Sequence, residues 1–130
     1  LNLKLMTSKF VVDGTGGKIE CEPFEVEHGN INALGFRIGP LVYLPDVSEI
    51  PPKAWQAVIG ADCWVLDALR RAPHPSHSHL EQSLAWIAKS HVKNAVLTNM
   101  HIDLDYDTLC EELPKGVKPA YDGMALSYEL

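Results

Sequence analysis

Hydrophobic and polar residues alternate along the first third of the chain, a pattern that predicts β-strands. Residues 9–13 (KFVVD) and 18–27 are expected to form a hairpin, because the glycine-rich segment 14–17 between them lets the chain reverse. In the second of these segments the apolar positions change phase at Pro23. Since proline cannot donate to a sheet ladder, this change predicts a bulge or a sheet edge there.

After residue 50 the pattern changes to alternating helices and strands. Continuous apolar runs predict strands that are covered on both faces, and apolar residues at helical spacing predict the helices between them. The expected elements in order are a second hairpin over 34–38 and 41–45, a helix begun by Pro51 and Pro52 and closed by Gly60, a strand over 63–69, a helix near 80–91, a strand over 95–98, and a helix from Asp105. β-hairpins followed by β-α-β-α predict an α/β fold.

Two of the helices carry start signals. Ser78 and Glu81 have the S-x-x-E spacing of a capping box, and Asp105 can cap the last helix. We therefore expect Ser78 to be an N-cap and His79 to face water.

Composition sets the size and excludes some partners. The 130 residues, 46% of them hydrophobic, suffice for one core that buries roughly two-thirds of the surface exposed by the unfolded chain. A formal charge of -6 gives no positive surface for nucleic acid or for an anionic membrane. No apolar run approaches the ~20 residues of a membrane span. Three cysteines without CxxC spacing indicate neither a disulfide framework nor a zinc ribbon, so a cytoplasmic location is expected.

Polar residues with metal-binding or acid-base chemistry gather directly after the expected strands. They are His28, Asp46, the His-rich segment 74–79 and the segment 99–105. Loops beyond the carboxyl ends of strands converge in open α/β sheets and are the usual place for ligands.

Each of these signals has a structural alternative. His28 can be a turn residue with its ring in solvent, and Asp46 can open a turn through its own side chain. A short His-rich tract can be a solvated helix entrance. With Ser78 and His79 assigned to the helix start, His77 is the histidine of that tract that we expect to face a cleft.

Five segments in order resemble one family. They are VEHGNINALGFRIG (26–39), LVYLPD (41–46), PHPSHSHLEQSLAWI (73–87), AVLTNMHIDLDY (95–106) and AYDGM (120–124). This order resembles the C-terminal half of metallo-β-lactamase-fold hydrolases, in the branch typified by phosphoribosyl cyclic phosphate phosphodiesterases. The resemblance implies an αβ/βα sandwich fold.

The resemblance also implies roles for single residues. His28 corresponds to a metal ligand, Asp46 to the carboxylate that bridges two metals, and His77 to the histidine that contacts the phosphate and protonates the leaving oxygen. Relatives commonly have a ligand histidine directly after LT, where this chain has Asn99. Because an amide oxygen is a poor substitute for imidazole toward zinc or manganese, we expect His101 to be the third ligand.

The HxHxDH motif of the family, which supplies most ligands of both metals, has no counterpart in these 130 residues. We therefore interpret residues 1–130 as the C-terminal portion of one metallo-hydrolase domain. We expect this portion to be inactive alone, to carry an apolar face that an N-terminal half would cover, and to form homodimers through that face.

For the intact protein the resemblance implies hydrolysis of a cyclic or linear nucleotide or sugar phosphodiester by a water activated between two divalent ions, zinc or manganese. Two alternatives remain open. The same fold also hydrolyses thioesters and other acyl compounds, and Asn99 can mark a degenerate site in a binding or assembly module.

Overall fold

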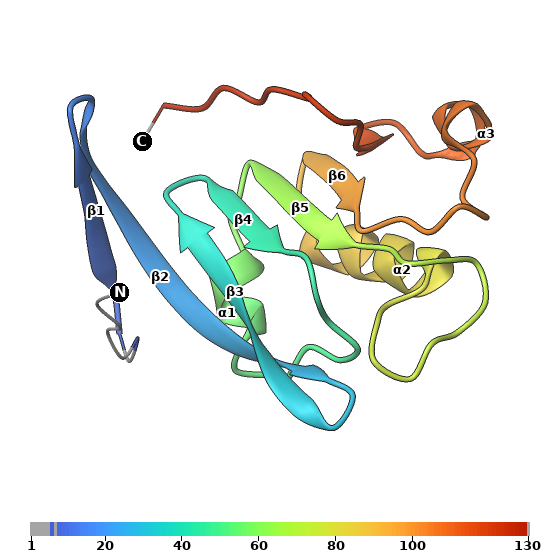
Figure 1. Ribbon diagram of the computed structural model, residues 1–130, viewed down its shortest axis with the longest axis horizontal. Helices are drawn as coiled ribbons and strands as arrows, with labels where there is room; N and C mark the ends of the chain where they lie inside the picture. Colours follow the sequence, from blue (N-terminus) through green and yellow to red (C-terminus); the bar gives the residue numbers. More distant parts are fainter. Residues whose placement is uncertain (1–5, 7, 130) are drawn as a thin grey trace.

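The computed structural model describes residue 6 and residues 8–129, which contain one seven-stranded sheet (Figure 1). The strands lie side by side in chain order. They are β1 (Phe10–Gly14), β2 (Gly17–His28), β3 (Ile31–Ile38), β4 (Leu41–Leu44), β5 (Cys63–Asp67), β6 (Asn94–Thr98) and β7 (Val117–Pro119).

The sheet has an antiparallel part and a parallel part. Strands β1 to β4 pair antiparallel through short turns, and β4 to β7 pair parallel. Parallel neighbours need crossover connections, and these contain the three helices α1 (Trp55–Val58), α2 (Leu80–Ser90) and α3 (Tyr106–Glu112). The expected α/β class and the order of hairpins followed by β-α-β-α are confirmed.

The long strand β2 changes its partner along its length. It pairs with β1 up to Cys21 and with β3 from Glu22 onward. Both registers run without an inserted residue, so the bulge considered at Pro23 is absent. The predicted edge is present. Strand β2 stops pairing with β1 after Cys21, so this side of β2 is a sheet edge from Glu22 onward, where Glu27 forms an isolated bridge to Glu49.

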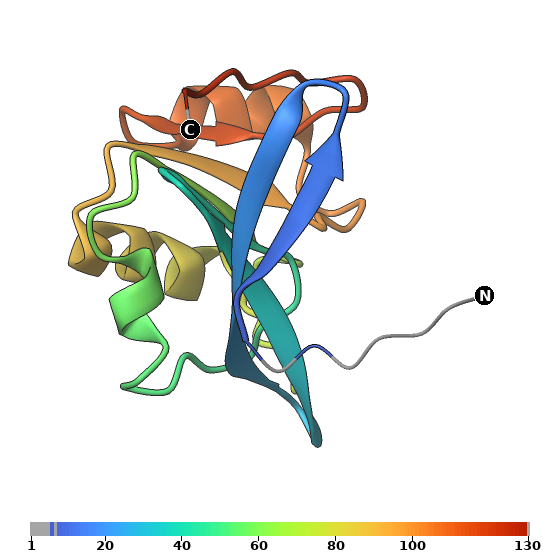
Figure 2. The same ribbon diagram turned by 90° about the vertical axis from the view of Figure 1, so that its left-hand side faces the viewer.

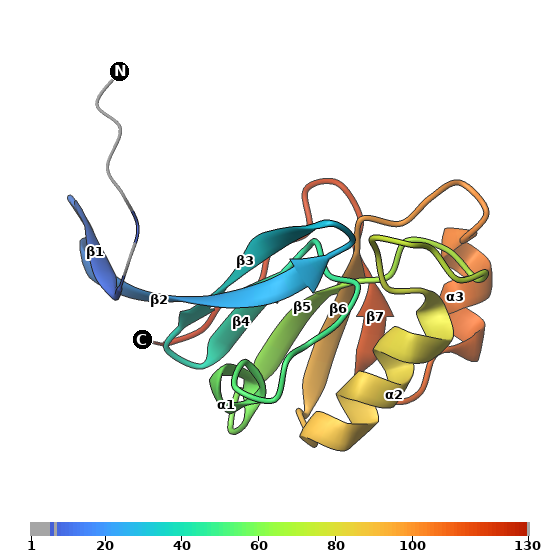
Figure 3. The same ribbon diagram turned by 90° about the horizontal axis from the view of Figure 1, so that it is seen from below.

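Helices α1 and α2 lie on the same face of the sheet, as two views show (Figures 2 and 3). Trp64 and Leu66 of β5 belong to the same buried cluster as Val58 of α1 and Trp86 of α2. The Trp55 and Trp64 rings meet edge to face with centroids 6.2 Å apart. Burying this surface is the main favourable term for the fold and holds the strands rigid beneath their loops.

The C-terminal segment after β7 runs back along the sheet toward the β1–β2 hairpin (Figure 1). The Cys63 thiol beside the Tyr128 hydroxyl raises the pKa of Tyr128 to about 12, and burial adds to this shift. The buried Cys63 begins β5, so the segment lies against the middle of the sheet.

Two details differ from the sequence-based expectations. Helix α1 begins only at Trp55, because Pro51 and Pro52 lie in the turns that precede it. Strand β7 was not expected at all, since it has only three residues and ends in proline. Within the described residues, no helix combines the length and the apolar character that crossing a bilayer requires.

The two helix-cap predictions had different outcomes. Asp105 caps α3 as expected, and its side chain accepts a hydrogen bond from the backbone N–H of Thr108. Ser78 is not the N-cap of α2, because His79 holds that position and makes no side-chain cap. The Ser78 hydroxyl instead donates to the backbone carbonyl of Asp67 at 2.7 Å.

Candidate metal centre

Four strands end at the same edge of the sheet. Two antiparallel steps separate β2 from β4, so β2 runs in the same direction as β4, β5 and β6. His28 is the last residue of β2, Asp46 follows β4 shortly after its end, His77 lies in the loop after β5, and Asn99 follows β6 directly. The loops that the sequence singled out therefore meet at one place.

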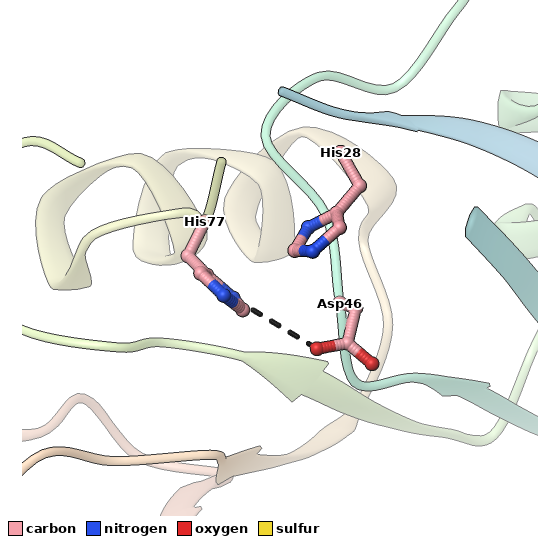
Figure 4. Close-up of side chains that lie close together, drawn as sticks. All are labelled: His28, Asp46 and His77. Carbon is pink, nitrogen blue, oxygen red and sulfur yellow. Dashed lines mark ion pairs between the residues drawn. The ribbon is translucent and has the colours of Figure 1, made fainter. Parts of the chain in front are cut away.

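His28, Asp46 and His77 form a cluster there (Figure 4). One potential ligand atom of each residue lies within 4.8 Å of those of the other two. The two imidazole rings meet edge to face with centroids 4.6 Å apart, and Asp46 Oδ1 lies 3.9 Å from His77 Nδ1. All three side chains are half-buried, so they remain accessible from solvent.

The orientation of His28 is set by the loop that carries His77. His28 Nδ1 lies 2.6 Å from the carbonyl oxygen of Ser76. A carbonyl only accepts, so Nδ1 carries the hydrogen and the lone pair of the neutral ring is on Nε2. A backbone carbonyl that fixes the tautomer in this way is the usual partner of a metal-ligating histidine.

The orientation of His77 is set by Asp67, the last residue of β5. The Asp67 side chain is 0% exposed, and its Oδ2 lies 2.9 Å from His77 Nδ1. Burial raises the pKa of the Asp67 carboxyl, while hydrogen bonds from His77, Val47 and Asn99 act in the opposite direction.

Asn99 has a left-handed backbone with φ of 61°. Its side-chain nitrogen lies 3.3 Å from each of three atoms, namely Pro45 O, Asp67 Oδ1 and His77 Nδ1. The residue at the position where relatives commonly have a ligand histidine therefore contacts the groups behind His77.

His101 lies outside the cluster. Its backbone N–H donates to the carbonyl of Leu69 at 2.7 Å, which keeps the residue near the end of β5. Its side chain is 59% exposed and pairs with Asp103, and this hydrogen bond lowers the pKa of the Asp103 carboxyl. The structure thus brings together three of the four expected site residues and leaves His101 at the rim.

His74 is a further histidine beside the cluster, with its ring centroid 5.2 Å from that of His77. Its Nδ1 accepts from the backbone N–H of Ser76 at 3.3 Å. Desolvation lowers the pKa of His74, and the nearby charge of Arg70 lowers it further.

Sequence reasoning missed Asp67, which holds His77. It was counted within the apolar run 63–69, although an acid inside an otherwise buried strand must find hydrogen-bond donors. This need for hydrogen-bond donors is the feature of the sequence that could have identified Asp67 as a site residue. The carbonyl of Ser76, which orients His28, carries no signal in the sequence because every residue has one.

The donor set fits a divalent transition metal. Imidazole and carboxylate groups are ligands that zinc and manganese sites commonly use, so His28 and Asp46 can hold an ion, and the fixed Nδ1–H of His28 leaves its Nε2 free to bind.

Comparison with known proteins identifies the class. Residues 5–102 match the family model of the beta-lactamase superfamily domain, and the chain belongs to this family. A diphosphatase of the PhnP family has a similar crystal structure, with a TM-score of 0.90 and 33% sequence identity over 97% of this chain. The fold is that of the metallo-β-lactamases, as the sequence resemblance implied.

Two other relatives are informative. A protein of Porphyromonas gingivalis named octanoyltransferase is 30% identical over 109 residues, which are 82% of this chain and 22% of that protein. Zinc-bound PqqB from Methylobacterium extorquens shares the fold, with a TM-score of 0.67 and 15% identity over 95% of this chain and 55% of that one. The chain spans 48% of the PhnP-family diphosphatase, so it corresponds to about half of that chain.

Proposed function

We propose that the intact protein is a metal-dependent hydrolase that cleaves a cyclic or linear phosphodiester of nucleotide or sugar type. The observation that carries this proposal is the cluster of His28, Asp46 and His77 at the carboxyl ends of the strands. The similarity to a PhnP-family diphosphatase at 33% identity supports a phosphorus centre as the site of attack.

His28 and Asp46 would hold the metal, His28 through Nε2 and Asp46 through its carboxylate. Bound divalent ions supply charge that stabilises the phosphoryl oxygens and makes a water molecule more acidic. His77 acts as the general acid. For this step the ring carries hydrogens on both nitrogens: Nε2 gives its proton to the departing oxygen as the P–O bond breaks, which leaves a neutral ring whose Nδ1–H stays on Asp67.

His101 remains our candidate for a further ligand. To reach the cluster its ring has to leave Asp103, and such surface ion pairs contribute little to stability. Its backbone bond to Leu69 already keeps it at the correct edge of the sheet.

We further propose that an N-terminal half of the same domain supplies the remaining ligands and covers the apolar side of the β1–β2 hairpin. Val12 and Ile19 are cross-strand neighbours there and are 51% and 39% exposed. In this chain alone the same surface would support a homodimer.

The function is tested on the full-length protein by metal analysis and by turnover of bis(p-nitrophenyl) phosphate. We expect two equivalents of zinc or manganese, and in His77→Ala a turnover that is lowered but still measurable, with the metal retained. His28→Ala and Asp46→Ala should both lose metal. The control is His91→Asn, since His91 lies at the far end of α2 with φ of 57°, which asparagine tolerates. Metal-free protein of normal stability would contradict the proposal.

One observation favours a second candidate, an acyl or thioester hydrolase. The relative from Porphyromonas gingivalis is named octanoyltransferase, although the match covers 22% of it. Parallel assays with an octanoyl thioester, the phosphodiester and a diphosphate separate these chemistries. Turnover of the thioester alone would favour acyl hydrolysis, and bound metal without any turnover would favour a binding module.

A further inference from the structure

We propose that Asp67 is a positioning residue for His77, and that Asn99 fixes Asp67 in turn. Together they hold the imidazole with Nδ1 toward the sheet and Nε2 toward the substrate. The inference rests on the proposed function only for its catalytic consequence, because the orientation can be measured without any activity.

The Asp67 carboxylate collects hydrogen bonds from three separate loops. Oδ2 lies 3.2 Å from the backbone nitrogen of Val47 and 2.9 Å from His77 Nδ1, and Oδ1 lies 3.3 Å from Asn99 Nδ2. A buried charge is costly unless donors surround it, and an ionised carboxylate is the one side chain here that only accepts. Asp67 therefore ties together the loops after β4, β5 and β6.

The backbone of Asp67 is held as firmly as its side chain. The hydroxyls of Ser78 and Ser83 each donate to its carbonyl oxygen at 2.7 Å. Both serines are buried, and they connect the end of β5 to the His-containing loop and to α2. The loop that carries His77 therefore contacts Asp67 twice, through the His77 ring and through the Ser78 hydroxyl.

The tautomer of His77 follows from this arrangement. Nδ1 has to carry the hydrogen, because the carboxylate at 2.9 Å can only accept. The side-chain nitrogen of Asn99 then cannot donate to Nδ1, so its two hydrogens go to Asp67 Oδ1 and Pro45 O. Asn99 thereby stabilises the carboxylate in the position from which it holds His77.

This network explains an unusual feature of the site. Asp67 shares its strand with Trp64 and Leu66, where an apolar residue would avoid the cost of burying a charge. Every side-chain hydrogen bond of its carboxylate described above points to the loops of the site. The carboxylate is thus placed to orient His77 rather than to complete the core.

The first test is the tautomer of His77 in the full-length protein. With 15N-labelled histidine, long-range proton–nitrogen correlation spectra distinguish an Nδ1–H ring from an Nε2–H ring, and His77→Ala assigns the signal. We expect the Nδ1–H pattern for His77 without added metal. An Nε2–H pattern, or rapid exchange between the two tautomers, would overturn the proposal even if the protein hydrolyses phosphodiesters.

The second test is Asp67→Asn. The new amide has to direct its NH₂ group at one of the three donors, so His77 loses its fixed acceptor or the loops separate. We expect kcat on bis(p-nitrophenyl) phosphate to fall about 10- to 100-fold with KM and metal content unchanged. Asp13→Asn is the matched control, because Asp13 lies in the distant β1–β2 hairpin.

A double variant distinguishes positioning from a general structural role. Asp67→Asn should cause no further loss of activity once His77 is alanine. If Asp67→Asn lowers the activity of the His77→Ala variant as much as that of the wild type, Asp67 acts through another group and the proposal is overturned.

If Asp67→Asn does not fold, Asn99→Gly keeps the left-handed backbone and should weaken the Nδ1–H pattern instead. If the wild type hydrolyses no phosphodiester, the proposed function fails while the tautomer still decides this inference.

Discussion

At the scale of single residues, Gly29 determines how His28 enters the site. Gly29 has φ of 63°, and a Cβ atom on it would lie 2.9 Å from Cβ of Ser76 and 3.5 Å from the carbonyl oxygen of Pro75. Its N–H donates to the hydroxyl of Ser48 at 3.0 Å. The hairpin turn therefore approaches the His-containing loop closely, and this approach lets Ser76 O reach His28.

Gly29→Ala should separate these two loops. The left-handed backbone and the contact with Ser76 together should cost roughly 1–3 kcal/mol of unfolding free energy. Metal affinity should fall as well, because His28 Nδ1 loses its carbonyl partner. Thermal unfolding and metal titration measure both effects. Gly14→Ala is the control, since nothing lies within 4 Å of that position, and an equal effect there would contradict this account.

Residue type predicted part of the site. His28, Asp46 and His77 follow strands, but each also has a structural alternative in its loop, so it was the resemblance to a known family that assigned them to the site. Asp67 was not selected because its neighbours in the sequence are apolar. Ser78 fits the spacing of a capping box, but its hydroxyl donates a hydrogen bond to the backbone carbonyl of Asp67. Local spacing cannot show whether a buried hydroxyl accepts from a helix N–H or donates to a carbonyl elsewhere, because that depends on tertiary contacts.

At the scale of secondary-structure elements, the cap of α3 is a pH-sensitive feature. Asp105 Oδ1 accepts from the Thr108 N–H at 2.9 Å and from its hydroxyl at 2.7 Å. These bonds lower the pKa of Asp105 in the folded protein. A lowered folded pKa stabilises the fold above the unfolded value of about 3.9. The contribution is lost as pH falls through the folded value.

Asp105→Ala should therefore lower the melting temperature at pH 7, and the difference from the wild type should shrink as the pH falls below about 4. Asp105→Asn retains an acceptor oxygen without the titrating charge, so it should unfold closer to the wild type at pH 7 than the alanine variant does. Melting curves across this pH range check both statements. A difference that stays constant with pH would contradict the role of the charge.

Elements with strong local signals were predicted well. Alternation, turn glycines and apolar runs identified β1 to β6 with small errors at their ends. The helix start at Pro51 was misplaced because the two prolines lie in a turn, closed by the bond from Ala54 N–H to Pro51 O at 2.9 Å, and α1 begins only after it. Strand β7 is formed by pairing with β6 over three residues, which local pattern does not reveal.

At the scale of the whole molecule, the hairpin surface of Val12 and Ile19 should control self-association of the isolated chain. The double variant Val12→Thr/Ile19→Thr retains β-branched side chains while removing apolar surface, so it should favour the monomer. Sedimentation velocity measures the change. Val11→Thr is the control, because Val11 is equally exposed at 51% but lies on the other face of its strand. A monomeric wild type would contradict the homodimer.

The arrangement of the sheet also fixes an order of events during folding. Strands β1 to β4 are joined by short turns, and hairpins of this kind form in about 1–10 μs. His28 and His77, by contrast, meet only after β5 has docked beside β4 through a crossover. Contacts between distant parts of a chain form more slowly because the loop must close first. We therefore expect a nascent chain to complete its hairpins before it can capture an ion.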